Sequence, residues 1–209
     1  MLKDKDIRES LFEFLEEKYD KIRIIEEKSM GESRADVVAI LTDKIVGIEI
    51  KSDADSYARL ERQIKDYELY FDYNFIVVGS THAKSVVEHV PKHWGIVSVE
   101  QFDNMLDFYI IREADINPNC KIEKKIRILW RPELAHILAI KEFPAYKAKS
   151  KEFVRDYLVE KVERQELDKL ISDELFERDY NTIAEDIMNY RKNQNPQKRI
   201  RKKRYKKSV

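Results

Sequence analysis

The sequence is poor in residues on which several classes of protein depend. It contains one cysteine, Cys120, and four glycines among its 209 residues. A single cysteine excludes a disulfide framework and a zinc site built from cysteines, so we expect the Cys120 thiol to be inert. The glycines form no glycine-rich phosphate-binding loop, and a nucleotide-triphosphate motor is therefore not expected.

Long apolar runs are missing as well. No stretch approaches the roughly 18 uninterrupted apolar residues that a membrane-spanning helix needs. The first ten residues also lack the apolar region of a secretory signal. Hydrophobic residues nevertheless make up 43% of the chain, which is enough for a sizeable core. We therefore expect a cytoplasmic protein that does not associate with membranes.

The charge of the chain is unevenly distributed, although its net value is zero. The last nineteen residues hold ten Lys or Arg and no acid, which leaves 30 basic and 40 acidic residues in positions 1–190. Blocks of like charge do not fold alone and often bind polyanions. We expect residues 191–209 to be a disordered tail that binds nucleic acid, chiefly through Lys198, Arg199, Arg201, Lys202, Lys203 and Arg204.

The spacing of apolar residues predicts an α/β core over residues 1–100. Helical spacing starts at Asp4 or Asp6 and returns over residues 55–71. Short Val- and Ile-rich runs predict strands at 22–27, 35–41, 44–51, 75–78 and 95–99, with a short helix near 83–90. The order α-β-β-β-α-β implies a mixed sheet with helices on its faces. Residues 101–190 form a mainly helical extension, which could bind a second copy or a protein partner.

The predicted strand at 44–51 separates two kinds of side chain. Alternate residues of a strand share a face, so Val46, Ile48 and Ile50 form an apolar face. Gly47, Glu49 and Lys51 form the other face. A carboxylate and an ammonium therefore emerge side by side, and Gly47 should leave room above the sheet.

The preceding strand adds a second carboxylate, Asp36. A two-residue loop at Thr42-Asp43 places Asp36 opposite Glu49, whereas a loop at Asp43-Lys44 places it opposite Lys51. Opposed β-carbons lie about 4.5–5.5 Å apart. A three-residue loop would break this parity unless a bulge restored it. Both two-residue loops bring these three side chains into one patch.

Two carboxylates this close repel each other unless a cation joins them. Oxygen ligands suit Mg²⁺ or Mn²⁺, with water and a substrate phosphate completing the coordination. A bound divalent ion activates water and neutralises charge on a phosphate, and an adjacent lysine adds a further positive charge. The combination predicts metal-assisted hydrolysis of a phosphodiester.

The surrounding residues resemble the PD-(D/E)XK nuclease superfamily, which has a restriction-endonuclease-like fold. A glycine-containing loop precedes Asp36, and Ser52-Asp53 follows Lys51. Gln63 and Tyr67 resemble the Q-x-x-x-Y motif of the RecB-like branch. Residues 4–99 are similar to a group of uncharacterised bacterial and phage proteins of this superfamily, through Asp6-Ile7-Arg8, Arg34-Ala35-Asp36, the run from Glu49 to Asp55, and Arg59-Leu60-Glu61-Arg62-Gln63. Ala35 departs from the proline that often precedes the acid.

The resemblance implies a role for each matching residue. Asp36, Glu49 and the backbone carbonyl of Ile50 would be the metal ligands, and Lys51 the catalytic lysine. Gln63 and Tyr67 would orient the site or the phosphate, and Arg34 would contact nucleic acid. Many members add an acid from the first helix. Asp4 fits best through its spacing to Ile7 and Leu11, and the open alternatives are Asp6, Glu9, Glu13, Glu26 and Glu27.

We therefore expect a Mg²⁺- or Mn²⁺-dependent endo- or exodeoxyribonuclease. The alternative is a module that retains the fold and binds nucleic acid or protein without cleaving.

Overall fold

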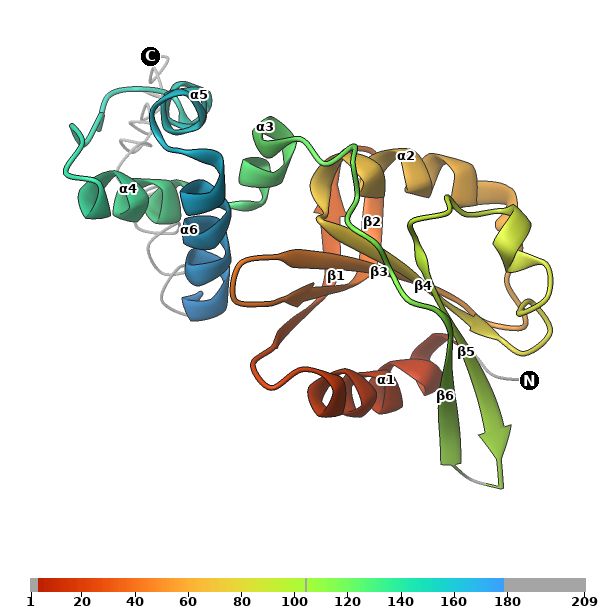
Figure 1. Cartoon of the computed structure of the whole chain (residues 1–209). Helices are drawn as coiled ribbons and strands as arrows, with labels where there is room; N and C mark the ends of the chain where they lie inside the picture. Colours follow the sequence, from red (N-terminus) through yellow and green to blue (C-terminus); the bar gives the residue numbers. More distant parts are fainter. Residues whose placement is uncertain (1–3, 104, 179–209) are drawn as a thin grey trace, which may run out of the picture. The chain divides into compact units, whose positions relative to one another are not determined.

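The computed structural model describes residues 4–103 and 105–178 (Figure 1). Of the described residues, those up to Phe176 belong to one compact unit. A second unit begins at Glu177, and of it only residues 177 and 178 belong to the described part. The six basic residues expected to form a nucleic-acid-binding tail therefore lie outside the described residues.

The first half of the compact unit alternates strands with helices. Its elements are α1 (Asp4–Lys18), β1 (Arg23–Met30), β2 (Ser33–Ile40), β3 (Ile45–Lys51), the 3-10 turn η1 (Tyr57–Arg59), α2 (Leu60–Tyr70), β4 (Tyr73–Gly79), the 3-10 turn η2 (Val86–Glu88), β5 (Gly95–Phe102) and β6 (Met105–Arg112). The predicted order α-β-β-β-α-β is confirmed.

The second half is helical. It consists of α3 (Ile122–Lys125), the 3-10 turn η3 (Ile126–Ile128), α4 (Arg131–Ile140), α5 (Lys151–Lys161) and α6 (Arg164–Glu177). Pro132 lies in the first turn of α4, where its missing N–H costs no hydrogen bond. Among the residues that the structure describes, no helix is long and apolar enough to cross a membrane.

The strands form one mixed sheet in the order β1-β2-β3-β4-β5-β6. Neighbours pair antiparallel except β3 with β4 and β4 with β5, which are parallel. Ile40 pairs with Ile45, and the N–H of Leu41 donates to the carbonyl of Lys44 at 2.9 Å. Thr42-Asp43 is therefore the two-residue hairpin loop, which selects the first of the two expected registers.

Two local expectations differ from the structure. Only a 3-10 turn, Val86–Glu88, forms where a short helix was expected at residues 83–90. The sheet also continues past residue 100, because β5 ends at Phe102 and β6 follows. Strand β6 pairs with β5 alone, and its odd-numbered residues are exposed, so its apolar residues lack the continuous buried pattern of β3 and β4.

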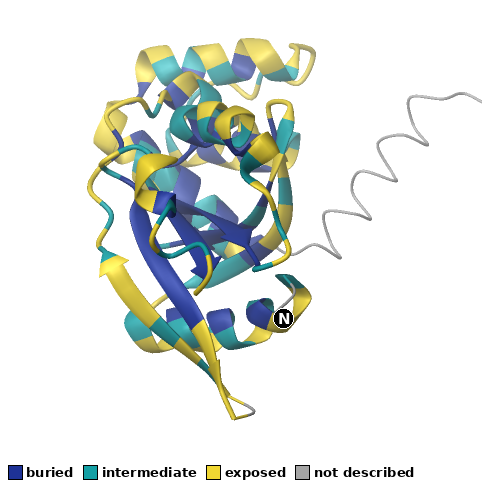
Figure 2. Cartoon of the chain, turned by 90° about the vertical axis from the view of Figure 1, so that its right-hand side faces the viewer, coloured by how far each residue is buried: buried dark blue, intermediate teal, exposed yellow. Residues whose placement is uncertain are grey.

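Each face of the sheet carries its own core. Helix α1 covers one face, where Ile7 and Leu11 pack with Val46, Ile48 and Ile50. Helix α2 covers the other face (Figure 1). Strands β3 and β4 between them are buried, whereas the end of β5 at residues 100–102 and the start of β6 at Met105 are exposed (Figure 2).

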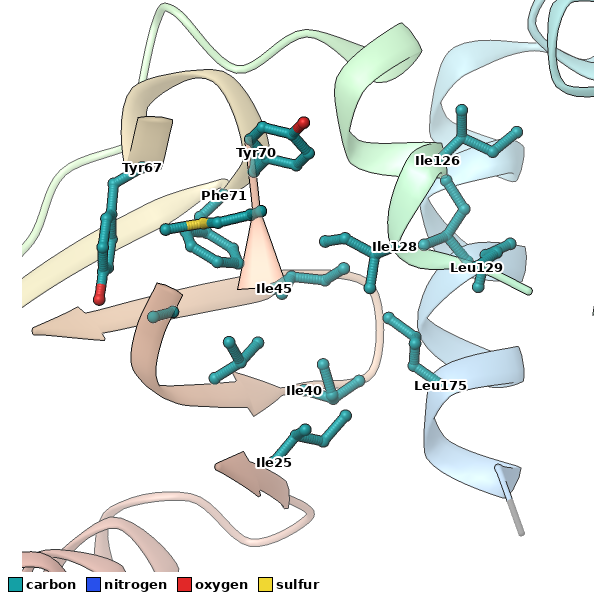
Figure 3. Packing of buried hydrophobic residues seen from close by; sticks show 14 of the residues in the cluster. Ile25, Ile40, Ile45, Tyr67, Tyr70, Phe71, Ile126, Ile128, Leu129 and Leu175 are labelled. Carbon is teal, nitrogen blue, oxygen red and sulfur yellow. The ribbon is translucent and has the colours of Figure 1, made fainter. Parts of the chain in front are cut away.

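The helical extension shares the core on the α2 side. Ile40 and Ile45 at the end of the β2–β3 hairpin belong to one buried cluster with Ile128 and Leu175, as the close-up shows (Figure 3). The extension therefore closes the end of the sheet opposite to the end at which Asp36 and Lys51 lie.

Gly47 has a different role from the one expected. A Cβ at this position would lie 2.1 Å from the ring of Phe71. The space above the sheet at Gly47 is thus filled by an aromatic ring at the end of α2, and it is not available to a ligand.

A fully buried lysine ties the extension to the sheet. The ammonium of Lys125 donates to Asp72 at 2.6 Å and to Asp168 of α6 at 2.8 Å. Asp72 also accepts from the N–H of Ile45 at 2.7 Å. One ammonium therefore bridges two carboxylates from distant parts of the chain, and Arg164 adds a second cation at Asp168.

We expect Lys125→Ala to reduce the free energy of unfolding by about 3–5 kcal/mol, because it leaves the buried Asp72 without its cation and Asp168 with Arg164 alone. Urea unfolding followed by circular dichroism measures the change. Lys161→Ala removes an exposed ion pair with Glu160 and should cost less than about 1 kcal/mol. Equal losses in the two variants would contradict this role of Lys125.

Candidate active site

The core of the site is the carboxyl-terminal end of β3. Glu49 and Lys51 are buried on the face covered by α2, whereas Ile48 and Ile50 pack toward α1. The side chain of Glu49 is 1% exposed and that of Lys51 is 8% exposed. Their charged groups form an ion pair, so neither charge is buried alone. The expected separation of an apolar and a charged face is confirmed.

Asp36 lies where β2 and β3 separate. The register places it opposite Glu49, but regular pairing ends at Val37 and Ile48. The Asp36 carboxylate instead accepts a hydrogen bond from the N–H of Ile50 at 2.9 Å. On the other side, the regular pairing of β1 with β2 also skips the position of Asp36 and Glu27, where Glu27 has a φ of 52°. The sheet therefore opens at Asp36.

Helix α2 brings Gln63 and Tyr67 onto Glu49. Both Lys51 and the Gln63 amide donate to Glu49 Oε1, and Lys51 also donates to Gln63 Oε1 at 3.2 Å. The Tyr67 hydroxyl lies 2.8 Å from Glu49 Oε2 and 3.1 Å from the carbonyl oxygen of Ile48. It also accepts from the N–H of Asp36 at 3.4 Å. The spacing of four residues puts Gln63 and Tyr67 on one helix face, as expected.

Arg8 of α1 compensates the acids on the open side of the site. It donates to Asp4 at 2.7 Å and to Glu26 at 3.3 Å, and it lies 3.7 Å from Asp36. Asp4 and Glu27 line the same cleft as Asp36. Asp6, Glu9 and Glu13 are exposed and are not among the residues described as lining it. Asp4, which spacing favoured, is thus the acid of α1 that lies beside the site.

The residues after Lys51 hold a turn in place. Asp55 accepts from the N–H and the hydroxyl of Ser52, at 2.9 and 2.7 Å. Asp53 accepts from the Thr81 hydroxyl at 2.7 Å and so joins this turn to the loop after β4. The acids that follow Lys51 in the sequence motif therefore fix the backbone beside the site.

Burial and mutual repulsion set the ionisation of the site. Burial and the nearby charge of Glu49 together raise the pKa of Asp36 to about 7, against the opposing hydrogen bond from the N–H of Ile50. Burial and the charge of Glu49 also raise the pKa of Tyr67, so its hydroxyl keeps its proton near neutral pH and can donate. By contrast, burial raises the pKa of the Cys120 thiol to about 12, which agrees with an unreactive side chain.

Asp36, Glu49, Lys51 and Gln63 lie at the floor of an open cleft of about 630 Å³. The described residues that line it are Asp4, Arg8, Glu27, Ser29, Gly31, Glu32, Ser33, Arg34, Asp36, Glu49, Ile50, Lys51, Asp55, Arg59, Arg62 and Gln63. Arg34 is exposed at this cleft and forms an ion pair with Glu27 at 3.0 Å. Sequence reasoning missed Arg59 and Arg62 as site residues, although the position of Arg59 one turn before Gln63 could have indicated the first of them.

The oxygen donors of the cleft suit a hard divalent cation. Glu49 is buried and Asp36 is partly buried, and a cation would relieve the repulsion between their carboxylates. Over residues 4–103 and 105–178, no group of three or more His, Cys, Asp or Glu side chains is arranged to hold a metal ion. The protein could therefore supply two carboxylates and the Ile50 carbonyl, and water and substrate would complete the coordination.

Comparisons with known proteins identify relatives of this chain. A family model described as Bacteriophage P4 protein cII matches residues 1–203. Protein cII of Enterobacteria phage P4 is 26% identical over 141 residues, which cover 66% of this chain and 53% of that protein. The chain thus spans about half the length of this curated relative. Among solved structures, SfsA of Pyrococcus furiosus in complex with Ca²⁺ aligns with a TM-score of 0.33 at 16% identity, over 56% of this chain and 62% of that one.

The raised pKa of Asp36 predicts how Asp36→Asn changes stability with pH. In the unfolded chain the carboxyl ionises near its usual pKa of 3.8, whereas in the folded protein it ionises near 7. Ionisation of Asp36 therefore lowers stability as the pH rises from about 4 to about 7. Asparagine cannot ionise, so in EDTA the variant should gain several degrees in melting temperature over the wild type across this range, and the gain should level off above pH 7.

Thermal unfolding by circular dichroism between pH 5 and 8 measures this difference. Asp43→Asn removes an exposed carboxylate from the hairpin loop and serves as the control. If the melting temperatures of Asp36→Asn and the wild type differed by the same amount at every pH, Asp36 would have an ordinary pKa.

Proposed function

This chain belongs to the family of bacteriophage P4 protein cII, and we propose that it is a metal-dependent nuclease that hydrolyses phosphodiester bonds of DNA. The observation that carries the proposal is the convergence of Asp36, Glu49 and Lys51 at the floor of one open cleft. Gln63 and Tyr67 from α2 complete the group.

Asp36, Glu49 and the carbonyl of Ile50 would hold Mg²⁺ or Mn²⁺. The fit of this donor set rests on its chemistry, because hard oxygen ligands with a net negative charge suit these ions. A divalent ion bound there supplies charge that activates water and neutralises a phosphate. Arg8 offsets part of the negative charge around Asp36 and would have to share that carboxylate with the ion.

Lys51 would place its ammonium against an oxygen of the scissile phosphate. Its side chain is held by Glu49 and Gln63, so little freedom is lost when substrate enters. Tyr67 keeps its proton and donates from the buried side, which fixes the orientation of the Glu49 carboxylate. These contacts position the charged groups before any substrate arrives.

The order of elements supports a restriction-endonuclease-like core, as does the position of each motif residue on it. The acid-x-Lys motif lies on β3, the first acid lies at the fork between β2 and β3, and the Gln-x-x-x-Tyr motif lies on the helix that follows. The match between the sequence pattern and a single cleft favours membership of the PD-(D/E)XK superfamily.

One observation favours a second candidate, a binding module that does not cleave. Both oxygens of Glu49 are already engaged, since Oε1 accepts from Lys51 and Gln63, and Oε2 lies within hydrogen-bond distance of Tyr67. A carboxylate satisfied in this way is stable without a metal ion. Such a cleft could bind a phosphate through Lys51 and leave the ester intact.

A nuclease assay separates the two candidates. We expect purified protein to cleave DNA with Mg²⁺ or Mn²⁺ and not with EDTA, when tested on linear, circular and single-stranded forms. Asp36→Asn and Lys51→Ala should each lose about 100-fold or more in rate, because the first removes a charged ligand of the proposed metal ion and the second removes the ammonium placed against the phosphate.

Glu88→Gln and Lys84→Ala are matched controls, because they remove an exposed acid and an exposed lysine outside the cleft. Both controls should cleave at the wild-type rate. An inactive wild type, or equal rates in all five proteins, would overturn the nuclease and leave the binding module.

A further inference from the structure

The amino-terminal end of α2 carries two arginines that no acid of the cleft pairs with among the described residues. Arg59 and Arg62 are exposed, and both line the cleft. Within the described part of the chain, neither forms an ion pair or a side-chain hydrogen bond. The other cations of the lining are paired, Arg8 with Asp4, Lys51 with Glu49, and Arg34 with Glu27.

The two arginines are placed by the same helix that completes the site. Arg62 and Gln63 follow Arg59 by three and four residues, so both lie on the side of the helix that Arg59 occupies. Gln63 on this face contacts Glu49 and Lys51 at the floor. A chain of phosphates with one group at Lys51 would therefore bring neighbouring groups past Arg59 and Arg62.

The lining favours contact with phosphates over contact with bases. Apart from Gly31 and Ile50, every described residue of the lining is charged or polar. Unstacked bases of single strands are held mainly by stacking on aromatic rings, whereas charged side chains contact the backbone. A duplex keeps its bases stacked inside and presents its phosphates outward.

We propose that Arg59 and Arg62 bind the phosphate backbone of a nucleic-acid duplex next to the phosphate held at Lys51. This inference rests on the proposed function for the position of that phosphate, and it extends that function to the substrate class. The two guanidinium groups would set the path of the strand across the mouth of the cleft.

Removing the charge of Glu32 should change DNA affinity in the opposite direction to removing the arginines. Glu32 is exposed at the same cleft, and its carboxylate has no cationic partner among the described residues. A phosphate strand crossing the mouth should be repelled by this charge. Glu32→Gln should therefore strengthen binding, whereas loss of the arginines weakens it.

Fluorescence anisotropy with a labelled 20-base-pair DNA duplex, and with one strand of it alone, tests the proposal on the full chain in EDTA. Arg59→Ala/Arg62→Ala should weaken duplex binding by about tenfold or more and reduce the salt slope by about 0.9 per arginine. Lys84→Ala/Lys92→Ala removes two exposed lysines elsewhere and gives the same change in net charge. It should change affinity much less.

The proposal predicts that the wild type prefers the duplex to the single strand, and that Glu32→Gln binds more tightly than the wild type. It is overturned if the arginine variant matches the lysine control, if the single strand binds better, or if the wild type binds neither DNA. Cleavage assays on the same proteins separate the two proposals. Duplex binding that depends on the arginines, without cleavage, would contradict the nuclease proposal alone. Cleavage at the wild-type rate by the arginine variant would contradict only the proposed role of Arg59 and Arg62.

Discussion

A buried ion pair between Glu49 and Lys51 is the interaction on which the site depends. Each charge would be costly to bury by itself, and together they are neutral inside the sheet. Gln63 and Tyr67 satisfy the remaining hydrogen-bonding capacity of the carboxylate, so α2 is held over the end of β3 by polar contacts as well as by apolar packing. These contacts hold β3, α2 and the floor of the cleft in one arrangement.

The same principle recurs at the far end of the sheet. Lys125 is fully buried between Asp72 and Asp168 and joins the helical extension to the α2 side of the fold. The two buried lysines differ in their surroundings. Lys51 lines a cleft of about 630 Å³, where a ligand can contact it. Lys125 is fully buried, and its contacts stabilise the fold.

Asp36 is the exception to charge neutralisation. The backbone N–H of Ile50 and a distant contact with Arg8 compensate it only in part, and burial raises its pKa to about 7. A carboxyl group kept in such a place at a cost to stability is typical of a functional position. The opening of the sheet at Asp36, with Glu27 in a left-handed conformation beside it, creates the cleft in which that carboxyl group could bind a cation.

The sequence by itself determined the strands around Asp36 and Glu49, the apolar and charged faces of β3, and the helix that carries Gln63 and Tyr67, because these depend on local periodicity. The register could be narrowed to a few alternatives, of which the structure has the Thr42-Asp43 loop. Only the tertiary structure decided that Phe71 fills the space at Gly47 and that Arg8 lies against Asp36. It also decided that Arg59 and Arg62 line the cleft with no ion-pair partner among the described residues. Those outcomes depend on contacts between residues far apart in the chain, which no local spacing encodes.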